Sequence, residues 1–235
     1  MEFPTLPQPS SVARHFVSAL RTARREETPY RHWRLRDVLP EAACVGILSL
    51  PIAPPQVRHL DGTRASFNAQ RSFFTPRRIA RYAPCAMLAE ALQRPEVARG
   101  FAETCGVEVA GSFLRIEYIQ DLDGAWLEPH CDIPEKLFSM VIYLCTGPDA
   151  ETWGTDIYDA ERRWVGRSSA EFDSAVIFIP GNNTWHGFDP RPIDGVRRLM
   201  EINYVRPNWR DRDQLCFPDQ PIGLDEGSVG EQMRL

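Results

Sequence analysis

The spacing of apolar residues changes at Gly111, and this change limits the possible folds more than any other feature of the sequence. Before it, apolar residues recur at helical spacing, as at Val12, Phe16 and Leu20. After it, short runs rich in β-branched and aromatic residues are separated by Asp-Gly, Gly-Pro and Pro-Gly turn signals. Short strands of this kind bury their apolar faces by packing sheets together. The sequence therefore predicts an α+β protein, with a β-sandwich or jelly roll supported by N-terminal helices.

The expected elements fall into three zones of a single domain. A chain of 235 residues is long enough to bury one sizeable core. We expect residues 1–110 to be mostly helical and to pack on the core, residues 111–208 to form the core, and residues 209–235 to form a polar tail. Helices are expected over 12–25, 41–50, 78–92 and 96–104, and strands over 30–38, 112–120, 137–145, 175–179 and 196–205, with a hairpin over 156–166.

Charge and composition argue against several classes of protein. The net charge of -5 disfavours a nucleic-acid partner. The longest apolar stretch, residues 43–52, is too short to span a membrane and contains Pro51. The N-terminus lacks a cationic segment followed by an apolar one, so we expect a cytoplasmic protein. Six cysteines without a CxxC pair are expected to be reduced thiols.

Two histidines and an aspartate in the β-rich zone have the spacing of a metal site. His130 and Asp132 form an H-x-D where we expect a strand to begin, and residues two apart project from one face of a strand. His186 follows several expected strands later, and a jelly roll can bring it back to them. Two imidazoles and one carboxylate leave open positions on a metal. On the next strand, Arg197 can hold a carboxylate with both arms of its guanidinium.

With these residues in place, the sequence resembles the Fe(II)/2-oxoglutarate-dependent oxygenases over residues 112–208. Their pattern is H-x-D, then a distant H, then Arg or Lys about ten residues later, which here gives His130, Asp132, His186 and Arg197. The resemblance implies a double-stranded β-helix as the catalytic core. It also implies Fe(II) held by His130, Asp132 and His186, 2-oxoglutarate as co-substrate with its far carboxylate on Arg197, and O2. The implied activity is a dioxygenase that hydroxylates its substrate and releases succinate and CO2.

One position departs from the family. The family often has Arg-x-Ser, whose hydroxyl shares the co-substrate carboxylate, whereas this chain has Leu199. We expect Tyr118, Tyr143 or Arg115 to supply the missing hydrogen bond. Arg198 is the alternative to Arg197 if the strand register is shifted by one residue.

Each of these residues also has an ordinary structural interpretation. His130 and Asp132 could be a polar pair in a surface loop, and His186 a buried histidine that bonds a backbone carbonyl. Arg197 could pair with Glu201 or Asp194. We favour metal and carboxylate binding because all four residues occur together in the expected order.

Two other functions remain open. A cupin-type metalloenzyme that does not use 2-oxoglutarate is also a jelly roll, but cupins generally carry H-x-H, so Asp132 disfavours it. A non-catalytic jelly-roll binding module would have the same residues by coincidence.

The expected substrate is a small polar or amino-acid-like molecule, and a peptide side chain is possible. This expectation rests on mixed polar residues of strands that could face the metal. No nucleic-acid or membrane partner is expected, and the sequence does not predict the oligomeric state. The candidate pocket residues are Arg115, Glu117, Tyr118, Gln120, Trp126 and Asn203.

Overall fold

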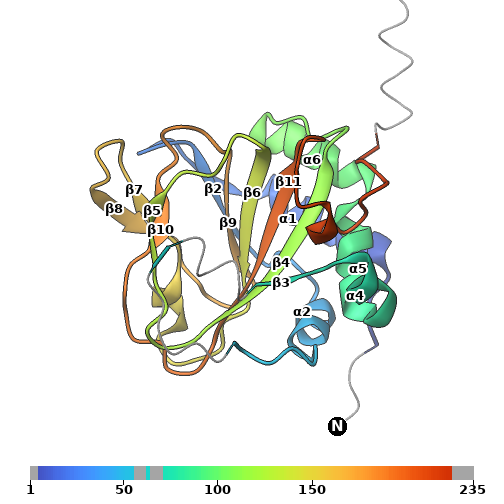
Figure 1. Ribbon diagram of the computed structural model, residues 1–235, viewed down its shortest axis with the longest axis horizontal. Coiled ribbons are helices and arrows are strands. Elements are labelled where there is room, and N and C mark those ends of the chain that lie inside the picture. Colours follow the sequence, from blue (N-terminus) through green and yellow to red (C-terminus); the bar gives the residue numbers. More distant parts are fainter. Residues whose placement is uncertain (1–4, 56–61, 64–70, 224–235) are drawn as a thin grey trace, which may run out of the picture.

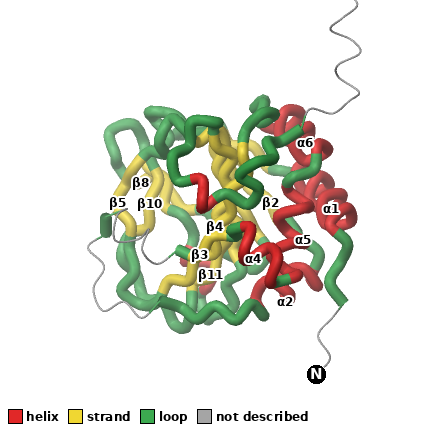
Figure 2. Tube along the Cα trace, turned by 45° about the vertical axis from the view of Figure 1, so that its right-hand side comes forward, coloured by secondary structure: helices red, strands yellow, loops and turns green. Residues whose placement is uncertain are grey.

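The protein consists of three layers: helices, a large sheet and a small sheet (Figures 1 and 2). The computed structural model describes residues 5–55, 62–63 and 71–223. The large sheet has seven antiparallel strands in the order β1-β2-β9-β6-β11-β4-β3, and the small sheet has four in the order β5-β10-β7-β8. The large sheet comprises β1 (Arg24–Glu26), β2 (His32–Arg36), β3 (Ser72–Phe73), β4 (Phe113–Asp121), β6 (Lys136–Tyr143), β9 (Ser174–Phe178) and β11 (Arg197–Val205). The small sheet comprises β5 (Leu127–His130), β7 (Asp156–Tyr158), β8 (Trp164–Arg167) and β10 (His186–Phe188).

The helices lie on the side of the large sheet away from the small sheet (Figure 2). An aromatic cluster joins the two layers: the ring centroid of Phe101 is 5.8 Å from that of Phe16, 4.1 Å from that of Phe138 and 5.2 Å from that of Tyr204. Within the described ranges, no helix combines the length and apolar character needed to cross a membrane. The helices are α1 (Pro9–Arg21), α2 (Glu41–Leu48), α4 (Pro76–Arg81), α5 (Ala83–Leu92) and α6 (Pro95–Cys105), with 3₁₀ turns at Ala150–Trp153 and Arg212–Gln214.

Strand alternation divides the side chains of the central strand β11 between two cores. Met200 and Ile202 belong to the core shared with the helices. Leu199 belongs to the second core, together with Phe188 of the small sheet. Side chains two apart on a strand share a face, so Glu201 lies on the same face as Leu199. The space between the two sheets therefore receives the odd-numbered residues of β11, which include Arg197, Glu201 and Asn203.

The N-terminal zone is less uniformly helical than its sequence pattern suggests. The expected helix over 12–25 ends at Arg21, and β1, β2 and β3 of this zone all join the large sheet. The expected helix over 78–92 is divided at Tyr82, because Pro84 occupies the first turn of a new helix, where a missing N–H costs nothing. At the other end of the chain, the amide of Cys216 donates to the carbonyl of Leu114, so this part of the expected tail lies on the core.

We predict that Phe101→Ala lowers the free energy of unfolding by about 3–5 kcal/mol, because its side chain is fully buried among aromatic rings. Urea denaturation followed by circular dichroism measures this loss. Phe172→Ala is the matched control, since Phe172 is 43% exposed. Equal losses for the two variants would contradict the placement of Phe101 between helices and sheet.

Candidate metal centre

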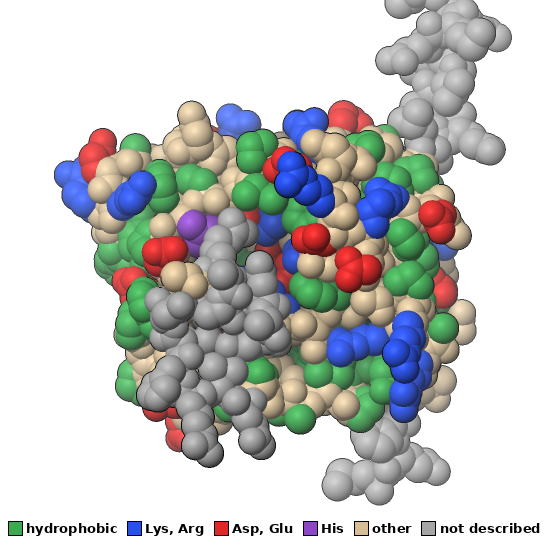
Figure 3. Space-filling view, in the orientation of Figure 1, with side chains coloured by type: hydrophobic (Ala, Val, Ile, Leu, Met, Phe, Trp, Pro, Cys, Tyr) green, Lys and Arg blue, Asp and Glu red, His purple; other side chains and the backbone are tan. Residues whose placement is uncertain are grey.

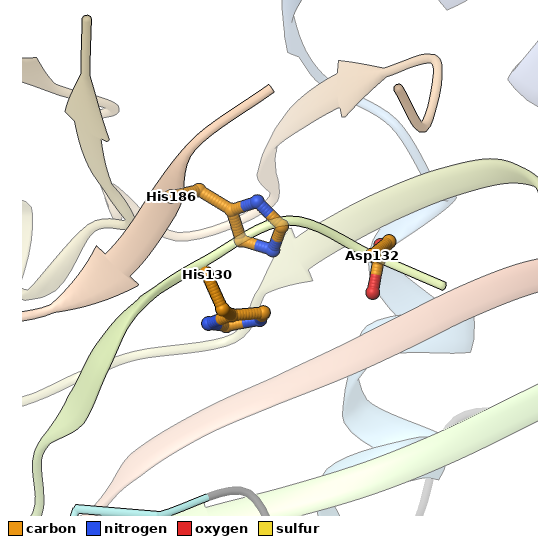
Figure 4. A group of neighbouring side chains, drawn as sticks. All are labelled: His130, Asp132 and His186. Carbon is orange, nitrogen blue, oxygen red and sulfur yellow. The ribbon is translucent and has the colours of Figure 1, made fainter. Parts of the chain in front are cut away.

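The two histidines of the expected metal site meet through strand pairing. Strands β5 and β10 are antiparallel neighbours, and His130 lies directly opposite His186 in their register. Their ring centroids are 4.3 Å apart. One ligand atom from each of His130, Asp132 and His186 lies within 4.8 Å of the other two (Figure 4). The structure thus brings His186 to His130 and Asp132, which lie more than fifty residues earlier in the chain.

Asp132 reaches this position in a different way from the one the sequence suggested. We expected a strand to begin at the H-x-D, but β5 ends at His130, and Asp132 lies in the segment that follows. Pro129, which lacks an amide hydrogen, lies within β5, and β5 is an edge strand, where proline is tolerated. The Asp132 carboxylate therefore lies near the histidines but belongs to the segment that follows β5.

Both imidazoles are held in an orientation suited to metal binding. The Nδ1 atom of His130 donates to the carbonyl of Glu128, and that of His186 to the carbonyl of Thr184, each at 2.9 Å. In the neutral ring this bond leaves the Nε2 lone pair as the ligand. Burial lowers the pKa of His186 below its usual value, which favours the neutral form that metals require.

Two donors hold the Asp132 carboxylate. Lys136 Nζ donates to Oδ1, and Ser139 Oγ donates to Oδ2, both at 2.7 Å. Lys136 is the only lysine in the sequence, and its Nζ also donates to Oε1 of Glu201 at 2.7 Å. Burial alone would raise the pKa of Glu201, but Lys136 and Arg71 hold it well below its usual range.

These contacts are part of a closed ring of polar side chains on the pocket face of the large sheet. The ring contains three carboxylates and three cations, so its charges balance. Beside a surface histidine, acidic and basic side chains are visible in a recess of the molecule (Figure 3). In order around the ring, the members are Asp132, Lys136, Glu201, Arg71, Glu117, Arg115, Asn203 and Ser139.

Arg197 lies in the same pocket as the histidines. Its Nη1 donates to Asp121, its strand neighbour on β4, at 2.5 Å, and its Nε donates to the carbonyl of Trp153 at 2.6 Å. The guanidinium carbon lies 4.0 Å from the ring centroid of Phe188. Arg197 forms an ion pair with Asp121. From the sequence we had considered Glu201 and Asp194 as its partners.

Three further residues were considered for binding the co-substrate, and the structure places them on different faces of the large sheet. By alternation Arg198 faces away from the pocket, and it lies beside the hydroxyl of Tyr118. Tyr118 belongs to the core shared with the helices, so it does not face the pocket as expected. Tyr143 is on the pocket side, where its hydroxyl bonds Oγ of Thr155 at 2.6 Å and Oγ of Ser168 at 2.8 Å.

Only some of the residues that we expected to contact the substrate lie on the pocket face of the large sheet. Arg115, Glu117 and Asn203 belong to the ring on the pocket face. Gln120 lies on the other face, and its amide donates to the carbonyl of Ile52. Trp126 lies against Gly62.

Among the residues that sequence reasoning missed at this site are Lys136, Ser139, Thr155 and Arg71. Thr155 lines the pocket together with Arg197. The sequence signal for Thr155 was the glycine that precedes it. The structure gives the reason for that glycine, because an added Cβ at Gly154 would collide with the backbone of Ser168. Lys136 could have been noticed as the only lysine in a chain that otherwise uses arginine.

If the three residues bind a metal ion, His186→Ala removes one ligand and abolishes the stabilisation by that ion. Thermal unfolding with and without Co(II) tests this, because a saturating ligand at 100 times its Kd stabilises the native state by about 2.7 kcal/mol. His15→Ala, on α1, is the control and keeps the full shift. An unchanged Co(II) shift in the His186 variant would exclude this centre.

Comparison with known proteins gives matches in structure only. No family model matches the chain, and no curated protein matches its sequence. A Pseudomonas putida prolyl-4-hydroxylase matches with a TM-score of 0.51 at 14% identity, covering 83% of this chain and 98% of that one.

Two further prolyl hydroxylases match over most of the chain. The Trichoplax adhaerens enzyme, solved in complex with a peptide fragment of the hypoxia inducible factor oxygen degradation domain, has a TM-score of 0.55 at 12% identity and covers 84% and 90% of the two chains. A prolyl 4-hydroxylase of Phytophthora capsici has a TM-score of 0.57 at 10% identity, covering 99% and 77%. The resemblance to the oxygenases is therefore confirmed at the level of the fold: this chain has the fold of the prolyl hydroxylases.

Proposed function

We propose that the protein is an Fe(II)- and 2-oxoglutarate-dependent dioxygenase built on a double-stranded β-helix. The observation that carries this proposal is the cluster of His130, Asp132 and His186, together with Arg197 in the pocket that the two histidines line. The matches to prolyl hydroxylases support the same fold and the same general class.

The donor set fits Fe(II). Two imidazole nitrogens and one carboxylate oxygen form the ligand set of non-haem iron oxygenases, which leaves open positions for other molecules. The backbone carbonyls that hold His130 and His186 and the two donors on Asp132 keep these ligands oriented without further rearrangement. When bound there, Fe(II) would supply the activation of O2 that allows a C–H bond to be oxidised.

The co-substrate would lie between the metal ligands and Arg197. Asp121 and the Trp153 carbonyl fix the guanidinium, so little side-chain entropy is lost when it binds a carboxylate. Thr155 lines this end of the pocket, and its hydroxyl supplies the hydrogen bond for which Leu199 has no donor. Phe188 and Leu199 form apolar walls that exclude water from the reacting groups.

For the primary substrate, we propose a small polar or amino-acid-like molecule. The ring beside the centre is polar but carries no net charge, which suits an uncharged or zwitterionic substrate. A peptide side chain is the second candidate, supported by the peptide complex of the Trichoplax adhaerens neighbour. Succinate release in the presence of free amino acids and of short peptides distinguishes the two candidates.

We predict that Arg197→Ala raises the KM for 2-oxoglutarate about 10- to 100-fold, because a charge-assisted hydrogen bond contributes about 1.5–3 kcal/mol. The same variant should retain metal binding. Steady-state kinetics of succinate formation and Co(II) titration measure the two effects. Arg198→Ala, on the other face of β11, is the control and leaves the KM unchanged; equal changes in both variants would contradict the assignment of Arg197.

An anaerobic titration of the metal-free protein with Fe(II) and then 2-oxoglutarate tests the proposed function directly. The proposal expects one iron per chain and a weak visible charge-transfer band when 2-oxoglutarate is added. Iron binding without that band would favour the cupin-type enzyme. Absence of iron binding would favour the non-catalytic binding module.

A further inference from the structure

The candidate centre contains a second carboxylate that is not part of the cluster of three ligands. Glu201 lines the same pocket as His130 and His186. A single ammonium group, that of Lys136, lies between Glu201 and Asp132 and donates to both carboxylates at 2.7 Å. The carboxylate of Glu201 therefore lines the pocket of the two imidazoles, and one buried cation separates it from the carboxylate of Asp132.

Four such groups would suit a different kind of metal site. Two imidazoles and two carboxylates can surround a divalent ion with four protein ligands, which leaves fewer positions open for a chelating co-substrate. Without an intervening cation, two buried carboxylates repel each other, and a divalent ion relieves that repulsion by binding both. In the described part of the chain, Glu201 is not among the three residues whose ligand atoms lie within 4.8 Å of one another.

The contacts of Glu201 argue against its binding a metal ion. Its Oε1 accepts from Lys136, and its Oε2 lies 3.6 Å from Nη1 of Arg71. Arg71 is in turn fixed by Glu117, whose Oε2 accepts from Nη1 at 2.8 Å. The Lys136 side chain is only 2% exposed, so no solvent competes for its two carboxylate contacts. Both oxygens of Glu201 are therefore engaged by buried cations.

We infer that Lys136 is a positioning residue that keeps Glu201 out of the metal's coordination sphere, so that the centre has three protein ligands and keeps the positions that 2-oxoglutarate needs. This inference rests on the proposed function. Ser139 provides a useful contrast, because it holds Asp132 at the same distance but makes no contact with Glu201 among the hydrogen bonds of the described residues.

We expect that loss of Lys136 strengthens the binding of a divalent ion and weakens the binding of 2-oxoglutarate. The ring loses one positive charge and keeps three carboxylates, so Lys136→Met binds a divalent ion more tightly. Glu201 then joins the coordination sphere, so the affinity of the metal-loaded protein for 2-oxoglutarate falls at least about tenfold. A purely structural role for Lys136 would weaken both kinds of binding together.

The test uses Co(II) as a spectroscopic probe on the full chain. We compare the wild type, Lys136→Met, Glu201→Gln and the double variant by Co(II) titration, by the visible absorption of the bound ion, and by 2-oxoglutarate titration of the loaded protein. We expect Lys136→Met to show a changed Co(II) spectrum and weak 2-oxoglutarate binding. The double variant, which lacks the additional carboxylate, should recover both wild-type properties.

Three results would overturn the inference. These are a wild-type spectrum and 2-oxoglutarate affinity in Lys136→Met, a double variant as impaired as Lys136→Met, and the same spectral change in Ser139→Ala. Lys136→Gln retains a donor and serves as the second variant if Lys136→Met does not fold. Failure of the proposed function is distinguishable, because the wild type itself would then bind no Co(II) or no 2-oxoglutarate.

Discussion

Strand β11 lies between β4 and β6, and the rest of the structure depends on this pairing. All nine of its residues are in register with β4, and alternation sends its apolar side chains in two directions. Met200 and Ile202 hold the helices, while Arg197, Leu199 and Glu201 face the small sheet. Arg197, the apolar side chain of Leu199 and Glu201 of the polar ring thus lie in the pocket at the spacing of one strand's repeat. A shift of one residue would exchange the core and the site.

The ring of polar side chains is stable because its positive and negative charges balance. Breaking a buried ion pair by removing one partner typically costs about 3–5 kcal/mol, since the remaining charge has no compensation. In this chain each carboxylate of the ring contacts a cation, and the neutral side chains of Asn203 and Ser139 close the ring by hydrogen bonds to Arg115, to each other and to Asp132. The same matching allows a cluster of carboxylates to exist beside two imidazoles before any metal ion is bound.

Sequence reasoning succeeded where the signal was local or ordered along the chain. Strand-length runs predicted β4, β6, β9 and β11 to within two residues, because Gly, Pro and Asp mark their ends. From the order of His130, Asp132, His186 and Arg197 we predicted one site. In the structure the first three lie together, and Arg197 lines the pocket of the two histidines.

The remaining features depend on tertiary contacts. Short strands such as β1 and β3 have no pattern of their own and form only against a neighbour. Tyr118 was placed in the pocket because its face could not be assigned without the register of β4. Lys136 and Thr155 act through partners that are distant in the chain or lie in turns, so spacing did not reveal them. Burial of the single lysine also has a practical consequence: amine-directed reagents find no lysine side chain on the surface of the folded protein, so covalent labelling at Lys136 would report opening of the pocket.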